Sequence, residues 1–217
     1  QAGDVLPRAR IHAPSEDQAN ELAKMFSERQ ISRLYVVGSN DTTAPVIEES
    51  YSRLIAVLRD HLVEHPFIMG ERPGAADFAF FGQLTQLAQF DPTPTSLTAQ
   101  DAPRVYAWVM LMEDLSGEDP GDDGWFAPDT VPATLKAVLA EVGRVYVPFL
   151  LANAKALQDG AEEVNTTIGG APWTQKPFPY QGKCLMALRE SYAALDADAR
   201  TTFDALIKGT GCEALFA

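Results

Sequence analysis

Apolar side chains recur along residues 47–62 at steps of four, three, one, three and four, the spacing of one face of an α-helix. They are Ile47, Tyr51, Leu54, Ile55, Leu58 and Leu62. Pro45 stands at a position suited to the first turn of such a helix, and Pro66 follows its end. The pattern predicts an amphipathic helix over about 45–65.

The same spacing predicts further helices over 15–37, over 75–90, from Pro103 onward and over 131–158. Ser15 and Gln18 have the spacing of a capping box, and Pro148 should kink the last of these helices. Two short helices are expected after residue 182. Segments 91–103 and 165–182 are expected to be loops, and no alternating pattern predicts a strand. The sequence therefore predicts an all-α bundle.

The segment 75–90 has almost no polar face, so we expect it to be buried on all sides. Asp77 lies three residues after Gly74, where a carboxylate can accept hydrogen bonds from the free N–H groups of a first helical turn. We expect Asp77 to be a structural cap, bonded to N–H groups around Gly74 to Ala76, rather than a catalytic group. Because this role needs the ionised form, we expect the pKa of Asp77 to be lower in the folded chain than in the unfolded chain.

The chain is acidic, with 17 Lys and Arg against 30 Asp and Glu and a net charge of -13. This balance argues against a nucleic-acid partner, because phosphate binding depends on clustered Lys and Arg. No apolar run approaches the roughly 18–20 residues that a membrane span needs. The segment 113–129 holds seven acids and no Lys or Arg, together with Pro and Gly, and predicts a linker over 117–130.

Cys184 and Cys212 lack metal-ligand spacing, and we interpret them as inert free thiols in a reducing cytoplasm. The alternative is a secreted or periplasmic protein in which the two are bridged. His61 and His65 are four residues apart, so a weak metal site is conceivable. Two solvated histidines at a helix end are the favoured interpretation, and no metal is expected.

Residues 54–84 resemble the C-terminal helical domain of the glutathione transferases. In that family an amphipathic helix and a short loop precede a buried helix that opens with a hydroxyl cap and, three residues later, an Asp. Here Gly74 replaces the hydroxyl residue and Asp77 is present. Residues 102–115 are similar to the family's next helix, so the resemblance covers about 15–116. Residues 172–195 look like the extended tail of a bacterial subgroup of transferase-like proteins.

The resemblance implies a glutathione transferase C-terminal-like bundle with extra C-terminal helices. We expect a core over 1–116, an acidic linker over 117–130 and a helical extension over 131–217 packed on the core. In the family a thioredoxin-like domain supplies the glutathione pocket and the catalytic side chain. This chain shows no βαβ pattern and no C-x-x-C, so no catalytic residue is carried over.

The function that the resemblance implies is a substrate-side domain, inactive without a glutathione-binding domain. Glutathione and a small hydrophobic electrophile are expected as ligands only together with that domain. The resemblance makes the protein part of an enzyme only if such a domain lies upstream. A homodimer is compatible with it, and a cytoplasmic location is expected. The alternative is a non-catalytic binding or scaffold module on the same fold.

In the family the first helix of this domain lines the substrate cleft. Phe26, Arg29 and Arg33 follow one another there at steps of three and four, and an arginine pair can hold a carboxylate by forked hydrogen bonds. The alternative is two solvated arginines paired with Glu28 or other acids. We expect Trp108 and Met112 to belong to the core rather than to a pocket. Trp173 and Tyr180 lie in a proline-rich segment and are compatible with either a packing lid or a partner contact.

Overall fold

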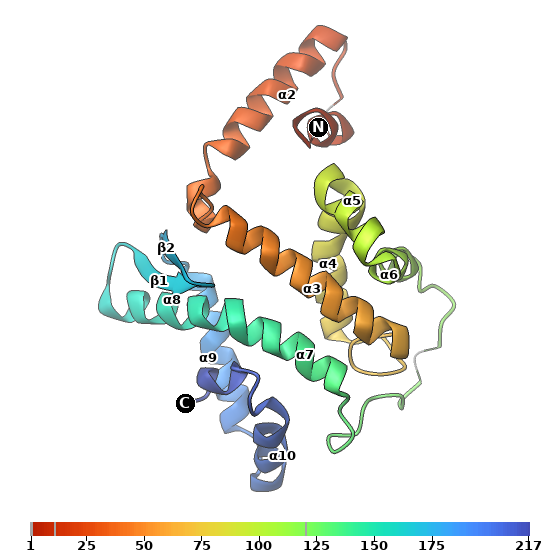
Figure 1. Cartoon of the computed structure of the whole chain (residues 1–217), viewed down its shortest axis with the longest axis vertical. Helices are drawn as coiled ribbons and strands as arrows, with labels where there is room; N and C mark the ends of the chain where they lie inside the picture. The colour runs from red at the N-terminus through yellow and green to blue at the C-terminus, as the bar shows by residue number, and fades with distance from the viewer. Residues whose placement is uncertain (1, 11, 120) are drawn as a thin grey trace. The chain divides into compact units, whose positions relative to one another are not determined.

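A computed structural model describes residues 2–10, 12–119 and 121–217 (Figure 1). The chain divides into two compact units. The first holds the residues up to 34 together with 58–125, and the second holds 35–57 and 126–217. Helix α3 (Ala44–Glu64) crosses from one unit to the other without a break. The expected three-part division at residues 116 and 131 stays a prediction.

The first unit consists of helices. Before α3 come α1 (Ala2–Arg10) and α2 (Glu16–Ile31). After the C-terminal half of α3 come α4 (Ala75–Leu84), the π-helical turn η2 (Thr85–Phe90), α5 (Pro92–Asp101) and α6 (Pro103–Glu113). Helix α1 packs on α2, while α4, α5 and α6 all contact η2. The buried apolar side chains of this unit include Leu58, Leu62, Leu84, Ala88, Val105 and Val109.

The second unit combines helices with one small sheet. It begins with the 3₁₀ turn η1 (Leu34–Val37), which lies at the unit boundary, and with the first part of α3. The elements that follow are α7 (Ala133–Glu141), η3 (Val142–Tyr146), α8 (Val147–Asp159), β1 (Val164–Ile168), β2 (Ala171–Gln175), α9 (Pro179–Ala193), α10 (Ala197–Ile207) and η4 (Cys212–Leu215). Strands β1 and β2 pair antiparallel, and β1 packs on α8 (Figure 1). Gly169 and Gly170 form the turn with φ of 57° and 83°, values that favour glycine.

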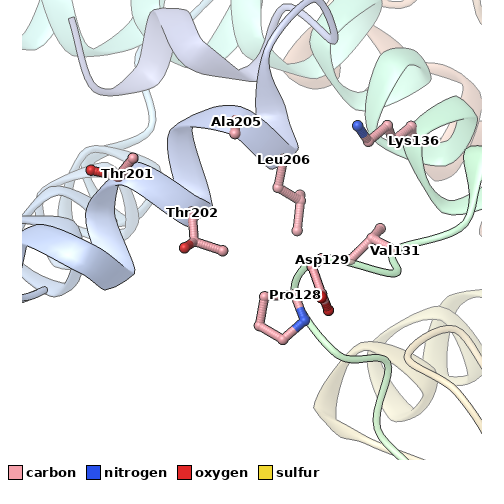
Figure 2. Close-up of a pocket in the computed structure, with 8 residues that line it drawn as sticks. All are labelled: Pro128, Asp129, Val131, Lys136, Thr201, Thr202, Ala205 and Leu206. Carbon is pink, nitrogen blue, oxygen red and sulfur yellow. The ribbon is translucent and has the colours of Figure 1, made fainter.

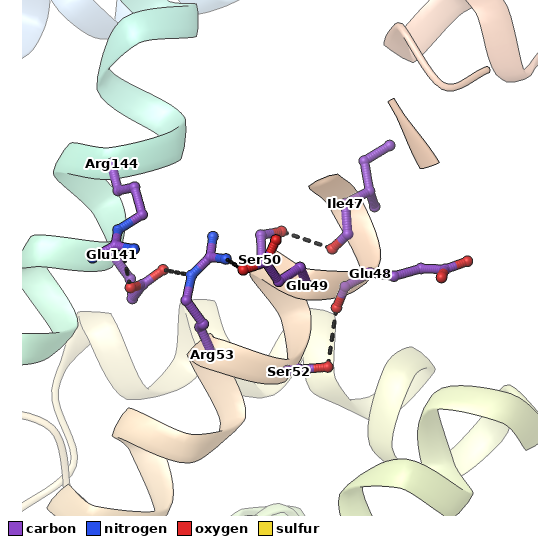
Figure 3. A network of polar contacts seen from close by, with 8 residues as sticks. All are labelled: Ile47, Glu48, Glu49, Ser50, Ser52, Arg53, Glu141 and Arg144. Carbon is purple, nitrogen blue, oxygen red and sulfur yellow. Dashed lines mark hydrogen bonds and ion pairs between the residues drawn. The ribbon is translucent and has the colours of Figure 1, made fainter. Parts of the chain in front are cut away.

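An ion-pair network fixes the first half of α3 within the second unit (Figure 3). Arg53 donates from Nε to Glu141 Oε2 at 2.9 Å and pairs with Glu49 at 2.8 Å. Arg144 pairs with the other oxygen of Glu141 at 3.4 Å. The hydrogen bond from Arg53 to Glu141 raises the pKa of the guanidinium, and the side chain of Glu141 is only 11% exposed. These half-buried contacts explain why residues 35–57 belong with the C-terminal half of the chain.

The structure confirms the mostly helical fold, including helices over 44–64 and from Pro103. Ser15 caps α2 and accepts from the N–H of Gln18 at 3.3 Å. The helix expected over 131–158 is interrupted by η3, and Pro148 lies in the first turn of α8, where its missing N–H is tolerated.

Three expectations for local structure are wrong. Residues 91–103 are not a loop, because Asp91 accepts from the N–H of Thr93 at 3.2 Å and caps α5, with Pro92 in its first turn. Residues 165–182 are not irregular, since most of them form the β1–β2 hairpin and the start of α9. Helix α1 (Ala2–Arg10) also precedes the helix over 15–37, the first one that the apolar spacing predicts.

The expected burial of 75–90 on all sides is also wrong. The buried side chains of α4 are Asp77 and Leu84, and Phe78 is 54% exposed. Asp77 and Leu84 are two helical turns apart, so they lie on one face, and α4 packs on α6 and η2. The helix is therefore buried along one face in spite of its apolar composition.

Candidate functional site

The carboxylate of Asp77 joins the start of α4 to the loop before it. The side chain is 0% exposed. Its Oδ2 accepts from the N–H of Gly74 at 2.9 Å, and its Oδ1 accepts from the N–H of Ile68 at 2.8 Å. Gly74 is the N-cap and has no side chain to return a bond, so the cap is one-sided. The sequence indicated the contact with Gly74 but not the contact with Ile68, which lies nine residues away.

Two other side chains hold the same loop. His61 of α3 donates from Nε2 to the carbonyl of Phe67 at 3.1 Å. Trp108 of α6 donates from Nε1 to the carbonyl of Pro66 at 3.1 Å. Together with Asp77 of α4, they give the loop over residues 66–68 a polar contact from three different helices. We call this group of three side chains the loop clamp.

Burial sets the protonation of the loop clamp. It raises the pKa of Asp77 above its ordinary value of 3.8, although the N–H bonds from Ile68 and Gly74 oppose the shift. The expectation of a lowered pKa for Asp77 is therefore wrong, because the desolvation of a fully enclosed carboxylate outweighs two hydrogen bonds. Burial likewise lowers the pKa of His61 below 6.5. His61 is 0% exposed, so the interpretation of this histidine as solvated is also wrong.

Trp125 explains why a glycine stands at the N-cap. A Cβ placed on Gly74 would lie 2.9 Å from a ring carbon of Trp125. The ring is held by the guanidinium of Arg72, 4.7 Å from its centroid, and by a backbone bridge from Trp125 to Gly70. The usual Ser or Thr would collide with this ring. Local spacing carries no signal of a contact between residues 51 positions apart.

The three residues expected to bind substrate lie at the end of α2. Phe26 is partly buried, while Arg29 and Arg33 are exposed. Arg33 lies in the turn after Ile31, the last residue of α2, so the regular helical spacing stops before it. Glu28 pairs with Lys24 at 3.9 Å, and within the described residues neither arginine forms an ion pair. The role of this group in binding stays a prediction.

The cysteines and histidines form no further reactive centre within the described residues. Cys184 and Cys212 are both free thiols, so the alternative with a bridge between them is wrong for this structure. Cys212 donates from Sγ to the carbonyl of Leu139 at 3.3 Å, and burial raises the pKa of its thiol. No group of three potential ligands for a metal ion occurs in the described part of the chain.

One cavity, of about 370 Å³, lies in the second unit between the loop over 128–131, α7 and α10 (Figure 2). Leu206 of α10 extends toward that loop (Figure 2). The hydroxyls of Thr201 and Thr202 already donate to carbonyls of the preceding helical turn, at 2.8 and 2.9 Å. The charged residues that line the cavity are Asp129 and Lys136. Two charged side chains with no further free polar group beside them are too few for a reaction centre.

Comparison with known proteins finds a family match over part of the chain. Residues 25–109 match the family model described as the C-terminal domain of glutathione S-transferase. All three side chains of the loop clamp lie within this matched stretch. No curated protein and no solved structure is similar enough to the chain to be matched with it. Among the described residues, no helix combines the length and apolar character needed to cross a membrane.

Proposed function

We propose that the chain is the helical, substrate-side part of a glutathione S-transferase-like protein. It contributes to a hydrophobic substrate cleft and to a domain or dimer interface, and it is inactive without a glutathione-binding domain. The match of residues 25–109 to the transferase C-terminal domain is the observation that carries this proposal. The buried contact from Asp77 to Gly74 supports it, because the resemblance to this domain depends on those two positions.

The end of α2 is the proposed substrate surface. Met25 and Ile31 are 60% and 67% exposed there, and both guanidinium groups of Arg29 and Arg33 lie in the same stretch. Exposed apolar side chains beside unpaired cations suit a ligand that is apolar and carries an anionic group. Phe26 supplies the apolar wall in this arrangement.

Catalysis is tested with the chain alone, glutathione and 1-chloro-2,4-dinitrobenzene. We expect no conjugation above the uncatalysed rate, because the sequence shows no βαβ pattern from which the family's glutathione-binding domain could be built. Measurable turnover would refute the proposal that a further domain is needed.

The sequence encoded upstream of Gln1 is the second test. A thioredoxin-like segment with Ser, Cys or Tyr near its first strand supports the enzyme, and an unrelated segment favours a binding or scaffold module.

Substrate binding at α2 is tested with two apolar dyes. Replacing both Arg29 and Arg33 by Gln should weaken binding of the anionic dye anilinonaphthalene sulfonate several-fold and leave the neutral dye Nile red unchanged. Lys24→Gln, on the same helix but paired with Glu28, is the matched control. Equal binding of the anionic dye by the double variant and the control would contradict a role for the arginine pair.

The cytoplasmic location and the homodimer are part of the same proposal. Two free thiols, one of them only partly buried, suit a reducing compartment. The exposed apolar side chains on α2 and α4 leave apolar surface for a partner or a second copy. Sedimentation of the reduced protein over a range of concentrations measures the assembly directly.

A further inference from the structure

Two aspartates of the chain are each followed directly by a glycine, in the pairs Asp123–Gly124 and Asp159–Gly160. Such a pair can rearrange chemically, because glycine has no side chain to shield its backbone nitrogen from the carboxyl group of the preceding residue. The rearrangement needs a free carboxyl group, a free N–H and a backbone that can move. The two pairs share this local sequence, so a difference in their reactivity has to come from the fold.

The pair Asp159–Gly160 ends helix α8 and is held on both sides. The carboxylate of Asp159 accepts from Nζ of Lys155 at 2.7 Å. The N–H of Gly160 donates to the carbonyl of Leu157 at 3.3 Å and closes the last turn of the helix. This nitrogen can turn toward the carboxyl group only if the helix end opens. We therefore expect the pair to stay intact while the protein is folded.

The pair Asp123–Gly124 lies in the acidic segment between α6 and α7, outside any helix or strand. Asp123 is exposed, and its carboxylate has no hydrogen bond or ion pair with another described residue. The N–H of Gly124 also donates to no described residue. Exposed segments with few backbone hydrogen bonds sample many conformations. Here the nitrogen and the carboxyl group are both free to meet.

We propose that Asp123 converts spontaneously to isoaspartate in the folded protein, whereas Asp159 does not. The backbone nitrogen of Gly124 forms a bond to Cγ of Asp123, and the side-chain oxygen leaves as water. The succinimide ring that results then takes up water at the main-chain carbonyl carbon of Asp123, and the bond from that carbon to the nitrogen breaks. The backbone now runs through the side chain of Asp123, one methylene group longer, and a free α-carboxylate remains. Water is the only co-reactant, and the step does not depend on the proposed function.

The lengthened backbone falls directly before the contacts that hold Trp125. The carbonyl of Gly124 accepts from the N–H of Glu71 at 2.7 Å, and Trp125 forms a backbone bridge with Gly70. The ring of Trp125 lies against the start of α4, 2.9 Å from where a Cβ on Gly74 would be. An added methylene group changes the reach and direction of Gly124. We expect the bond to Glu71 to break and the indole to leave the N-cap of α4.

Ageing the intact protein at neutral pH tests the modification. Isoaspartyl methyltransferase transfers a labelled methyl group to the free α-carboxylate of isoaspartate and not to aspartate, so labelled peptides identify the site. We expect the peptide with Asp123 to gain label and the peptide with Asp159 to gain several-fold less. In urea the two peptides should gain label at similar rates, because only the fold separates them. Equal labelling in the folded protein, or no label at Asp123, would overturn the proposal.

Asparagine variants give a second comparison of the two sites. Asn forms the same ring and releases ammonia, so deamidation is read directly as a change in mass and charge. Asp123→Asn should deamidate several-fold faster than Asp159→Asn in the folded protein, and the difference should vanish in urea. Equal rates in the folded state would show that the helix end at Gly160 gives no protection.

Hydrogen exchange tests the consequence for Trp125. The N–H of Glu71 should exchange faster in aged protein than in fresh protein. Asp123→Glu keeps the charge but closes the larger ring more slowly, so it should gain little label and show no change at Glu71. Asp122→Glu, the matched control, should age as the parent does. Unchanged exchange at Glu71 in a chain that carries isoaspartate at position 123 would overturn the proposed release of Trp125.

Discussion

Asp77 and His61 are both fully buried in the first unit, and burial moves their pKa values in opposite directions. Enclosure disfavours the charged form of either group, so it raises the pKa of the acid and lowers that of the base. His61 also lies near His65, with ring centroids 5.1 Å apart, and interacts electrostatically with Asp77. The loop clamp therefore owes its stability to hydrogen bonds rather than to a buried ion pair.

Removing the carboxylate of Asp77 should destabilise the fold. Asp77→Ala leaves the N–H groups of Gly74 and Ile68 without an acceptor, and we expect a loss of about 2–4 kcal/mol in the free energy of unfolding. Asp77→Asn keeps one acceptor oxygen and should cost less. Urea midpoints of the three proteins measure this, with the exposed Asp60→Ala as control. If all midpoints agree within error, the structural role of Asp77 is contradicted.

The pH dependence of Asp77 follows from its raised pKa. A folded pKa above 3.8 means that the folded chain holds the proton more tightly than the unfolded chain. The stability from this titration is fully present below 3.8 and is lost as pH rises through the folded pKa. The stability of the parent relative to Asp77→Asn should therefore increase as pH falls from neutral toward 4.

His61 should make the protein lose stability in mild acid. Its folded pKa lies below 6.5, so its contribution is present above 6.5 and is lost as pH falls through the folded pKa. The slope reaches at most about 1.4 kcal/mol per pH unit. Comparing unfolding of the parent and His61→Gln between pH 7.5 and 5.5 measures this effect together with the coupling of His61 to His65, since Gln can still donate to Phe67. Parallel pH profiles of the two proteins would contradict it.

At the scale of elements, the start of α4 is shaped by the segment around Trp125. Gly74 places the N-cap against the indole, and the N–H of Glu71 donates to the carbonyl of Gly124 at 2.7 Å. A Ser at position 74 would supply the missing half of the capping box, but only if the ring were not in the way. The choice of cap residue is thus decided by a contact between the start of α4 and the loop that contains Trp125.

A double-mutant cycle tests this contact between elements. Gly74→Ser alone should destabilise by about 1–2 kcal/mol, because the added side chain overpacks against Trp125. In a Trp125→Leu background the same change should be neutral or stabilise by about 0.5–1 kcal/mol, since Ser can then cap the helix. Urea midpoints of the four proteins give both values. An effect of Gly74→Ser with the same sign and size in both backgrounds would show that Trp125 does not select the glycine.

At the scale of the whole molecule, residues 114–119 and 121–132 lie outside any helix or strand and connect α6 to α7. The segment is rich in Asp and Glu and largely exposed, which makes it the expected site of proteolytic cleavage. A protease specific for acidic residues, used at low ratio, should cut first between Asp114 and Asp123. A first cut within α3 would contradict this expectation.

The position of the cut can be identified from the thiols. Cys184 and Cys212 both follow the acidic segment, so a maleimide dye added after denaturation should label only the C-terminal fragment. The mass of the labelled fragment then gives the cleavage site. Replacing Asp119, Asp122 and Asp123 by Asn should slow the cut, while the helical change Glu190→Gln should not.

The amino-acid sequence by itself determined the positions of helices and helix caps that depend on residues close together in the chain. The period of apolar residues sufficed for the helices over 44–64 and from Pro103, and the Ser15 cap lies within one helical turn of its donor. The contact between Gly74 and Asp77 spans three residues and is equally local. The resemblance of residues 54–84 to the transferase domain agrees with the family match over 25–109.

The tertiary structure alone decided what depends on distant residues. The bond from Ile68 to Asp77, the collision that keeps a glycine at position 74 and the assignment of residues 35–57 to the second unit all come from contacts between separate elements. The sign of the Asp77 pKa shift belongs here too, because desolvation depends on everything that surrounds a carboxylate and not on its own segment. The sequence did not predict a cavity beside the β1–β2 hairpin for the same reason, because its walls come from segments that only folding brings together.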